Sequence, residues 1–130
     1  MTQLADSPSP LTLSVPARPA GVTEARRALA AYAEQAGAES TDVELAVAEA
    51  VGNAVVHAYP GRSPGTVTVS ARIEDDGMVV AVADDGVGMR PNPDSPGLGL
   101  GLPLIARLSV EYSIRENGAG GTTVRMIFGL

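Results

Sequence analysis

Three polar residues, Glu49, Asn53 and His57, recur every four positions in an otherwise apolar segment of the chain. In a helix this spacing places their side chains in one stripe. The amide oxygen of Asn53 is a hard ligand that suits Mg²⁺, and a carboxylate one turn away could accept a proton from an attacking hydroxyl group. A solvated helix face is the alternative. Small neighbours, which would leave room for a ligand, weigh against it: Ala46, Ala50, Gly52 and Ala54.

A second polar group begins at Asp84, which follows the nearly continuous apolar run 78–83 and precedes Gly86 and Gly88. A carboxylate at the end of a buried strand would place a hydrogen-bond acceptor at the mouth of a crevice. Glycines let the backbone approach a ligand closely. An ordinary turn is the alternative interpretation, because Asp and Gly are the commonest turn residues.

A third group consists of Gly97, Gly99 and Gly101, which precede a predicted helix that Pro103 helps to start. Free backbone N–H groups and the helix dipole make such a start an anion site. A dinucleotide-binding fold requires its glycines directly after the first strand of a βαβ unit. Here a proline-rich loop precedes them and a hairpin follows, so that interpretation is rejected.

The elements that must position these groups follow from hydrophobic periodicity. A capping box formed by Thr41 and Glu44 predicts the start of the second helix, Gly37 suits the end of the first, and Asp76-Gly77 is a hairpin turn signal. The pattern predicts strands at 11–15, 67–73, 78–83, 110–114 and 124–128, and helices at about 20–36, 41–57 and 100–108.

This order of elements predicts an α/β fold of two layers, in which helices cover one face of a mixed, mostly antiparallel sheet. The 130 residues suffice for one domain. We expect it to span residues 11–130, after a flexible polar tail at 1–10.

Composition excludes several functions. The net charge of −6 argues against nucleic-acid or membrane-surface binding, since both require a basic face. All nine basic residues are arginine, so there is no phosphate-binding Walker lysine and no Schiff-base lysine. The absence of Cys and the single His exclude thiol chemistry and His-cluster metal sites. No apolar run approaches a membrane span and the N-terminus lacks signal-peptide features, so we expect a soluble cytoplasmic protein.

Taken together and in this order, the motifs between about residues 40 and 128 resemble those of the GHKL ATPases. The resemblance implies a Bergerat-type ATP-binding sandwich. The matching motifs are Glu49-x-x-x-Asn53 as the N box, Asp84-x-Gly86-x-Gly88 as the G1 box, Gly97-x-Gly99-x-Gly101 as the G2 box, and a terminal Gly121-Thr122.

Within that superfamily the chain is most similar to bacterial anti-sigma-factor serine/threonine kinases, in the string EAVGNAVVHAY and in the compact segment RPNPDSP between the two glycine boxes. The resemblance implies a regulator of transcription that binds a sigma factor and phosphorylates a serine of an anti-sigma-factor antagonist. Relatives of this kind are commonly dimers, so a homodimer remains open.

The resemblance also implies roles for individual residues. Asp84 would accept a hydrogen bond from the adenine amino group, so ATP should bind better than GTP, whose carbonyl would face the carboxylate. Thr122 would support the adenine end, and Asn53 would hold Mg²⁺. Glu49 would act as general base on the serine hydroxyl. The glycines would pack against the nucleotide: Gly86 and Gly88 at the adenine and ribose, and Gly97, Gly99 and Gly101 at the phosphates.

Two alternative functions make different demands on these residues. A nucleotide-binding interaction module without kinase activity would not need a base at Glu49, so that residue favours the enzyme. A histidine kinase carries a separate phosphoacceptor helix pair with its own His, whereas the only His here, His57, lies in the N-box helix and is expected to be structural.

Overall fold

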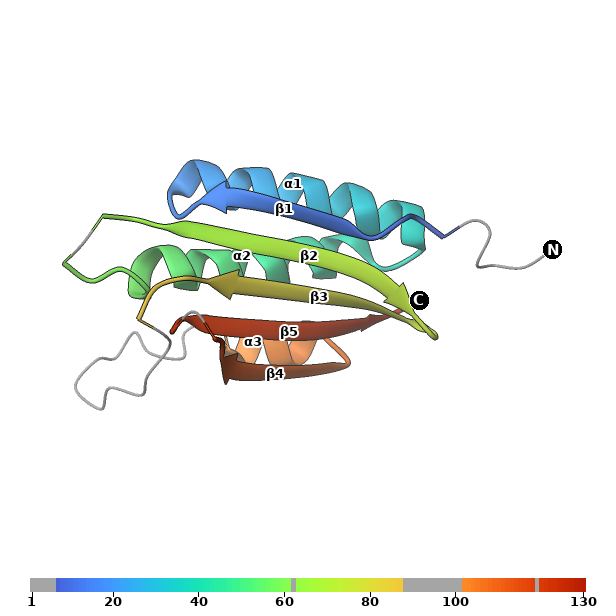
Figure 1. The fold of residues 1–130 in the computed structure, drawn as a ribbon. Coiled ribbons are helices and arrows are strands. Elements are labelled where there is room, and N and C mark those ends of the chain that lie inside the picture. The colour runs from blue at the N-terminus through green and yellow to red at the C-terminus, as the bar shows by residue number, and fades with distance from the viewer. Residues whose placement is uncertain (1–6, 62, 88–101, 119) are drawn as a thin grey trace.

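The computed structural model describes residues 7–61, 63–87, 102–118 and 120–130. Five strands form one sheet in the order β1-β2-β3-β5-β4, and every pairing is antiparallel. The helices lie together behind this sheet (Figure 1), so the predicted two-layer α/β fold is confirmed. The elements are β1 (Leu11–Pro16), α1 (Pro19–Ala36), α2 (Ser40–His57), β2 (Thr66–Glu74), β3 (Gly77–Asp84), α3 (Leu102–Leu108), β4 (Glu111–Glu116) and β5 (Thr122–Gly129).

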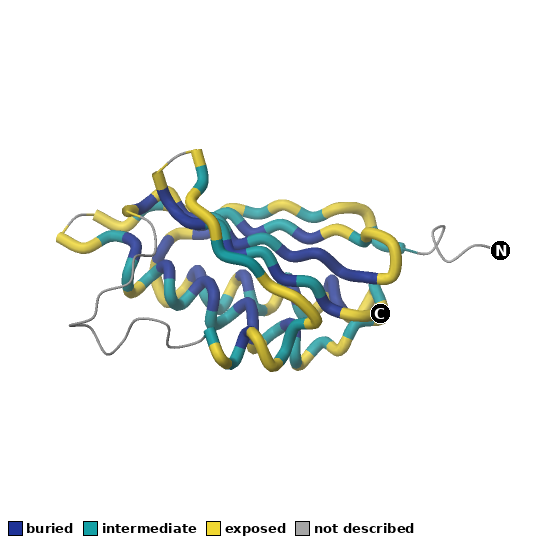
Figure 2. The backbone as a smooth tube through the Cα atoms, turned by 90° about the horizontal axis from the view of Figure 1, so that it is seen from below, coloured by how far each residue is buried: buried dark blue, intermediate teal, exposed yellow. Residues whose placement is uncertain are grey.

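The core lies between the two layers and is almost entirely aliphatic. Alternate residues of the strands point toward the helices, as the period-two pattern predicted, and Figure 2 shows the buried positions gathered where the helices meet the sheet. Only Tyr32 and Phe128 contribute aromatic rings to this core. Its largest fully buried side chains are Leu29, Met78, Ile105 and Met126, with Val15, Val43, Val47, Val51, Val67, Val69 and Val80.

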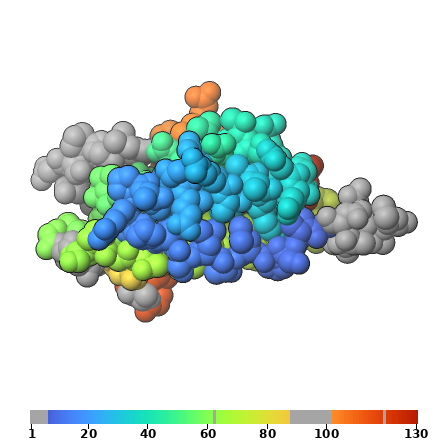
Figure 3. Space-filling view, turned by 90° about the horizontal axis from the view of Figure 1, so that it is seen from above, coloured from blue at the N-terminus to red at the C-terminus, as the bar shows by residue number. Residues whose placement is uncertain are grey.

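One edge of the molecule is formed by β1 and α1, which lie side by side in the space-filling view of Figure 3. The helix begins at Pro19, and a Cβ atom at Gly21 would overlap the Pro16 carbonyl. The helix ends at Gly37, which has a φ of 88° and donates its amide to the Ala33 carbonyl at 2.9 Å. The predicted helix and its glycine cap are therefore confirmed.

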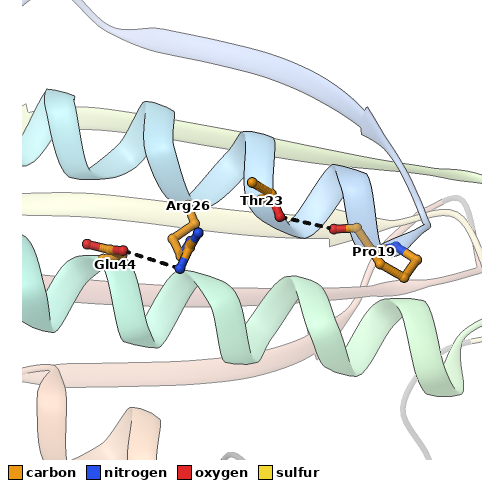
Figure 4. Close-up of polar contacts among 4 residues, drawn as sticks. All are labelled: Pro19, Thr23, Arg26 and Glu44. Atoms are coloured by element: carbon orange, nitrogen blue, oxygen red, sulfur yellow. Dashed lines mark hydrogen bonds and ion pairs between the residues drawn. The ribbon is translucent and has the colours of Figure 1, made fainter.

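The start of α2 differs from the prediction. Glu39 is the N-cap, and its carboxylate accepts a hydrogen bond from the Thr41 amide at 3.4 Å, so the Thr41–Glu44 capping box is wrong. Glu44 instead forms an ion pair of 3.6 Å with Arg26 on the neighbouring helix (Figure 4). Glu44, which the sequence pattern assigned to the cap of α2, therefore connects α2 to α1 instead.

The hairpin between β2 and β3 turns one residue earlier than predicted. Glu74 pairs with Gly77, so the turn consists of Asp75 and Asp76, and Asp75 has a φ of 54°. Asp tolerates this left-handed conformation better than most residues. Gly77 is the first residue of β3, where a Cβ would lie 3.0 Å from the Cγ2 of Ile127.

Within the described ranges no helix is both long and apolar enough to cross a membrane.

Candidate functional site

Asp84, the last residue of β3, is 8 % exposed and is held by two backbone amides. Its Oδ1 accepts hydrogen bonds from the N–H of Gly86 at 2.9 Å and of Thr122 at 3.3 Å. Its Oδ2 has no hydrogen-bond partner among the described residues. Because no fully buried side-chain oxygen in this part of the chain lacks a partner, Oδ2 is not fully buried. Oδ2 is therefore a fixed acceptor still open to a ligand's N–H group.

Glycines allow three segments to meet around this carboxylate. A Cβ atom at Gly86 would overlap the Ala58 carbonyl, just beyond α2, and would lie 2.6 Å from the Ala58 Cβ. A Cβ at Gly121 would lie 2.6 Å from the Asp84 Oδ1. Val87 also donates its amide to the Ala58 carbonyl at 2.9 Å. The end of the N-box helix, the G1 segment and the start of β5 are thus in direct contact.

Asn117 is a supporting residue that sequence reasoning missed. Its Nδ2 donates to the backbone carbonyl of Asp84 at 3.0 Å and to the Thr123 hydroxyl at 3.3 Å. Its Oδ1 accepts from the Gly121 amide at 3.2 Å. Asn117 therefore connects the last turn to the end of β3. The only sequence signal was an Asn in a glycine-rich turn, which is typical of any turn.

Tyr59 and Asp85 form a second missed contact. The Tyr59 hydroxyl donates to the Asp85 Oδ1, which also accepts from the Thr66 amide at 3.2 Å. Burial first, and then the hydrogen bond to Asp85, raise the pKa of Tyr59 to about 12. Asp85 is exposed, but its carboxylate connects the end of α2 to the start of β2. We call Tyr59, Asp85 and Thr66 the clamp.

Glu49 and Asn53 are half-buried on α2, and neither side chain has a hydrogen bond or ion pair with another described residue. Successive helical residues are about 100° apart, so both lie far around the helix from Glu44, which contacts α1. They therefore lie on a side of α2 that is turned away from the Arg26–Glu44 contact with α1. His57 is the last residue of the same helix.

The structure thus brings Asp84, Gly86 and Thr122 together and leaves the Glu49–Asn53 pair available along α2. The remaining predicted site residues lie outside the described residues: Gly88, Gly97, Gly99 and Gly101. No cluster of three or more His, Asp or Glu side chains suited to a metal ion occurs in the described part of the chain. A single amide oxygen fits Mg²⁺ when phosphates and water supply its other ligands.

Comparison with known proteins identifies the class. Residues 15–128 match the model of the histidine kinase-like ATPase domain, so the chain belongs to this family, as its resemblance to the GHKL ATPases predicted. Among relatives, it is 35 % identical to an anti-sigma F factor of Pasteuria penetrans, covering 79 % of each chain. It is 32 % identical to the anti-sigma F factor of Clostridium beijerinckii, covering 77 % of this chain and 80 % of the relative.

A solved structure of the RsbU and RsbW domains of Rv1364c from Mycobacterium tuberculosis has the same fold. The two superpose with a TM-score of 0.70 and 25 % identity over 92 % of this chain. The chain spans 31 % of that longer protein.

Proposed function

We propose that residues 11–130 form an ATP-binding domain that acts as an anti-sigma-factor serine/threonine kinase. The observation that carries the proposal is the Asp84 carboxylate, fixed by two backbone amides and open at Oδ2. Membership of an ATPase family and relatives named anti-sigma F factor support it.

In this proposal Asp84 selects the base. Its Oδ2 accepts a hydrogen bond from the amino group of adenine, and the backbone bonds to Gly86 and Thr122 keep the carboxylate from turning away. Guanine presents a carbonyl oxygen at the same position, which a carboxylate repels. A group held rigidly before binding loses little entropy when the ligand arrives.

At the other end, Asn53 contributes one oxygen to Mg²⁺, while Gly97, Gly99 and Gly101 offer backbone amides to the phosphates. ATP supplies the phosphoryl group when bound. Glu49 removes the proton from a serine hydroxyl of the partner as that oxygen bonds to the γ-phosphorus and the bond to the β–γ bridging oxygen breaks. ADP leaves, and the proton remains on Glu49 until solvent takes it.

The proposed partners are a sigma factor and the antagonist that carries the serine. The alternative is an interaction module that binds ATP without transferring phosphate. It is favoured if the parent protein binds ATP but transfers no phosphate to any protein.

The test compares the protein with Glu49→Gln, which keeps the size and polarity of the side chain. Each is incubated with Mg²⁺ and γ-labelled ATP in host extract, and ATP affinity is measured separately by calorimetry. We expect a serine of a small protein to be labelled by the parent only, with ATP affinity unchanged within roughly twofold. Equal ATP binding with no labelling by either protein would leave the interaction module as the function.

A further inference from the structure

The face of the sheet opposite the helices carries two rows of mostly small side chains, each of which includes one arginine on β4 or β5. Cross-strand pairing puts Ser14, Thr68, Ala83, Thr123 and Arg115 in one row, and Thr12, Ser70, Ala81, Arg125 and Ser113 in the next. Figure 1 looks onto this face, with the helices behind the strands. We call these ten residues the outer shelf. None of them is acidic, in a chain whose net charge is −6.

Arg115 and Arg125 have no ion-pair or hydrogen-bond partner among the residues that the structure describes. Arg115 is exposed and Arg125 is half-buried, and they are diagonal neighbours across β4 and β5. Neither forms an ion pair or a side-chain hydrogen bond with any residue the structure describes, whereas Arg26 and Arg72 each pair with a glutamate. Two adjacent guanidinium groups without a counter-charge repel each other, and a bound carboxylate between them would relieve this repulsion.

The surface around them is hollowed in two places. A pocket of about 420 Å³ is lined by Ser113, Arg115, Thr123 and Arg125, and also by Glu116, which has no ion pair with either arginine. A second hollow of about 360 Å³ shares Thr123 and continues past Ala83 to the ends of β2 and β3. Its other lining residues are Thr66, Thr68, Asp84, Asp85, Asn117 and Gly118. Together they form a groove across the strands, positive at β4 and acidic at the end of β3.

We propose that this groove docks an extended segment of a partner protein, with an acidic residue over Arg115 and Arg125. A single small anion would use only the arginine end. An extended chain also contacts the threonine hydroxyl groups that lie between the arginines and Asp85, and its opposite end reaches Asp85. The proposal goes beyond the kinase function and does not depend on it.

The arginine end of the groove lies on the sheet face opposite the Asp84 carboxylate, although Asp84 also lines the far end of the groove. The side chain of Asp84 belongs to the helix-facing row with Val15 and Val67, whereas the outer shelf faces away. The ATP affinity of each variant serves as a control that the nucleotide site remains intact.

The experiment uses the full chain and two synthetic peptides, one alternating Glu and Ser and the other alternating Gln and Ser. Binding is followed by fluorescence anisotropy and by amide chemical shifts. The variant R115E/R125E is compared with R27E/R107E, which makes the same charge change at exposed positions on α1 and α3. If the glutamates prevent folding, R115Q/R125Q replaces them.

We expect the Glu-Ser peptide to bind, to shift amides of β4 and β5, and to lose roughly tenfold in affinity for R115E/R125E but not for R27E/R107E. The Gln-Ser peptide should not bind. Equal loss in both variants, shifts confined to the helices, or no binding would overturn the proposal. Displacement by inorganic phosphate would show a small-anion site instead. Self-association of the protein that R115E/R125E abolishes would show that a second copy of the chain occupies the groove. Phosphate displacement or such self-association would also overturn the proposal.

Discussion

At the scale of single residues, the proposed adenine site depends on the Asp84 carboxylate, whose two oxygens have different surroundings. Oδ1 is engaged by the amides of Gly86 and Thr122, and Oδ2 has no partner among the described residues. In Asp84→Asn the side-chain oxygen can keep both backbone bonds, so the amide nitrogen takes the place of Oδ2. A donor then faces the adenine amino group, which is also a donor.

Asp84→Asn should therefore lower ATP affinity by about 10- to 100-fold, the equivalent of a charged hydrogen bond. GTP affinity should fall less, because the new amide can donate to the guanine carbonyl. Calorimetry with both nucleotides measures the ratio, with Asp76→Asn in the exposed turn as the control. An unchanged preference for ATP in Asp84→Asn would rule out Asp84 as the residue that reads the base.

Two glycines make a matched pair for testing close packing. Gly86→Ala should lower the free energy of unfolding by roughly 1–3 kcal/mol, because its Cβ overlaps the Ala58 carbonyl. Gly52→Ala meets no atom within 4 Å and lies inside α2, so it should raise the free energy of unfolding by roughly 0.5–1 kcal/mol. Urea denaturation measures both. Opposite signs are required, and the same sign in both variants would contradict this account of Gly86.

At the scale of elements, the clamp holds three segments together: the end of α2 through Tyr59, the G1 segment through Asp85 and the start of β2 through Thr66. Tyr59→Phe removes only the hydroxyl and should lower the free energy of unfolding by about 1 kcal/mol at neutral pH. The matched control is Tyr112→Phe, since Tyr112 is exposed on β4.

The clamp also predicts a pH dependence. The pKa of Tyr59 is raised from 10.0 to about 12 in the folded state. Its contribution to stability is therefore complete below pH 10 and is lost as the pH rises toward 12. The stability difference between the parent and Tyr59→Phe should shrink over that window, as measured by urea midpoints. A constant difference from pH 8 to the highest accessible pH would show that the hydroxyl acts through packing alone.

Element types and order could be predicted from sequence because each is encoded locally, by periodicity and by glycine or proline at the ends. The exact ends could not be predicted. Whether Glu39 or Thr41 caps α2 depends on where packing against α1 begins. The Glu44 side chain forms an ion pair with Arg26 on α1, so it does not take part in a capping box. Asn117 and Tyr59 escaped prediction because their partners lie 33 and 26 residues away in sequence.

At the scale of the whole molecule, the sheet separates two surfaces with different chemistry. The helix side holds the core and the Asp84 carboxylate, and the other side carries the outer shelf. Composition revealed the net negative charge but not its distribution, because the positions of Arg115 and Arg125 depend on strand register. That register follows from the pairing of β5 with both β3 and β4.

The central position of β5 also affects synthesis of the protein. On the ribosome β4 emerges before β5, yet it has no strand to pair with until residues 122–129 follow, because β5 lies between it and β3. Until then the apolar edge of β3 is exposed, and Asp84 lacks the amide of Thr122. A nascent chain therefore cannot have a finished site at Asp84, and if this site binds adenine as proposed, nucleotide binds only after β5 has left the exit tunnel.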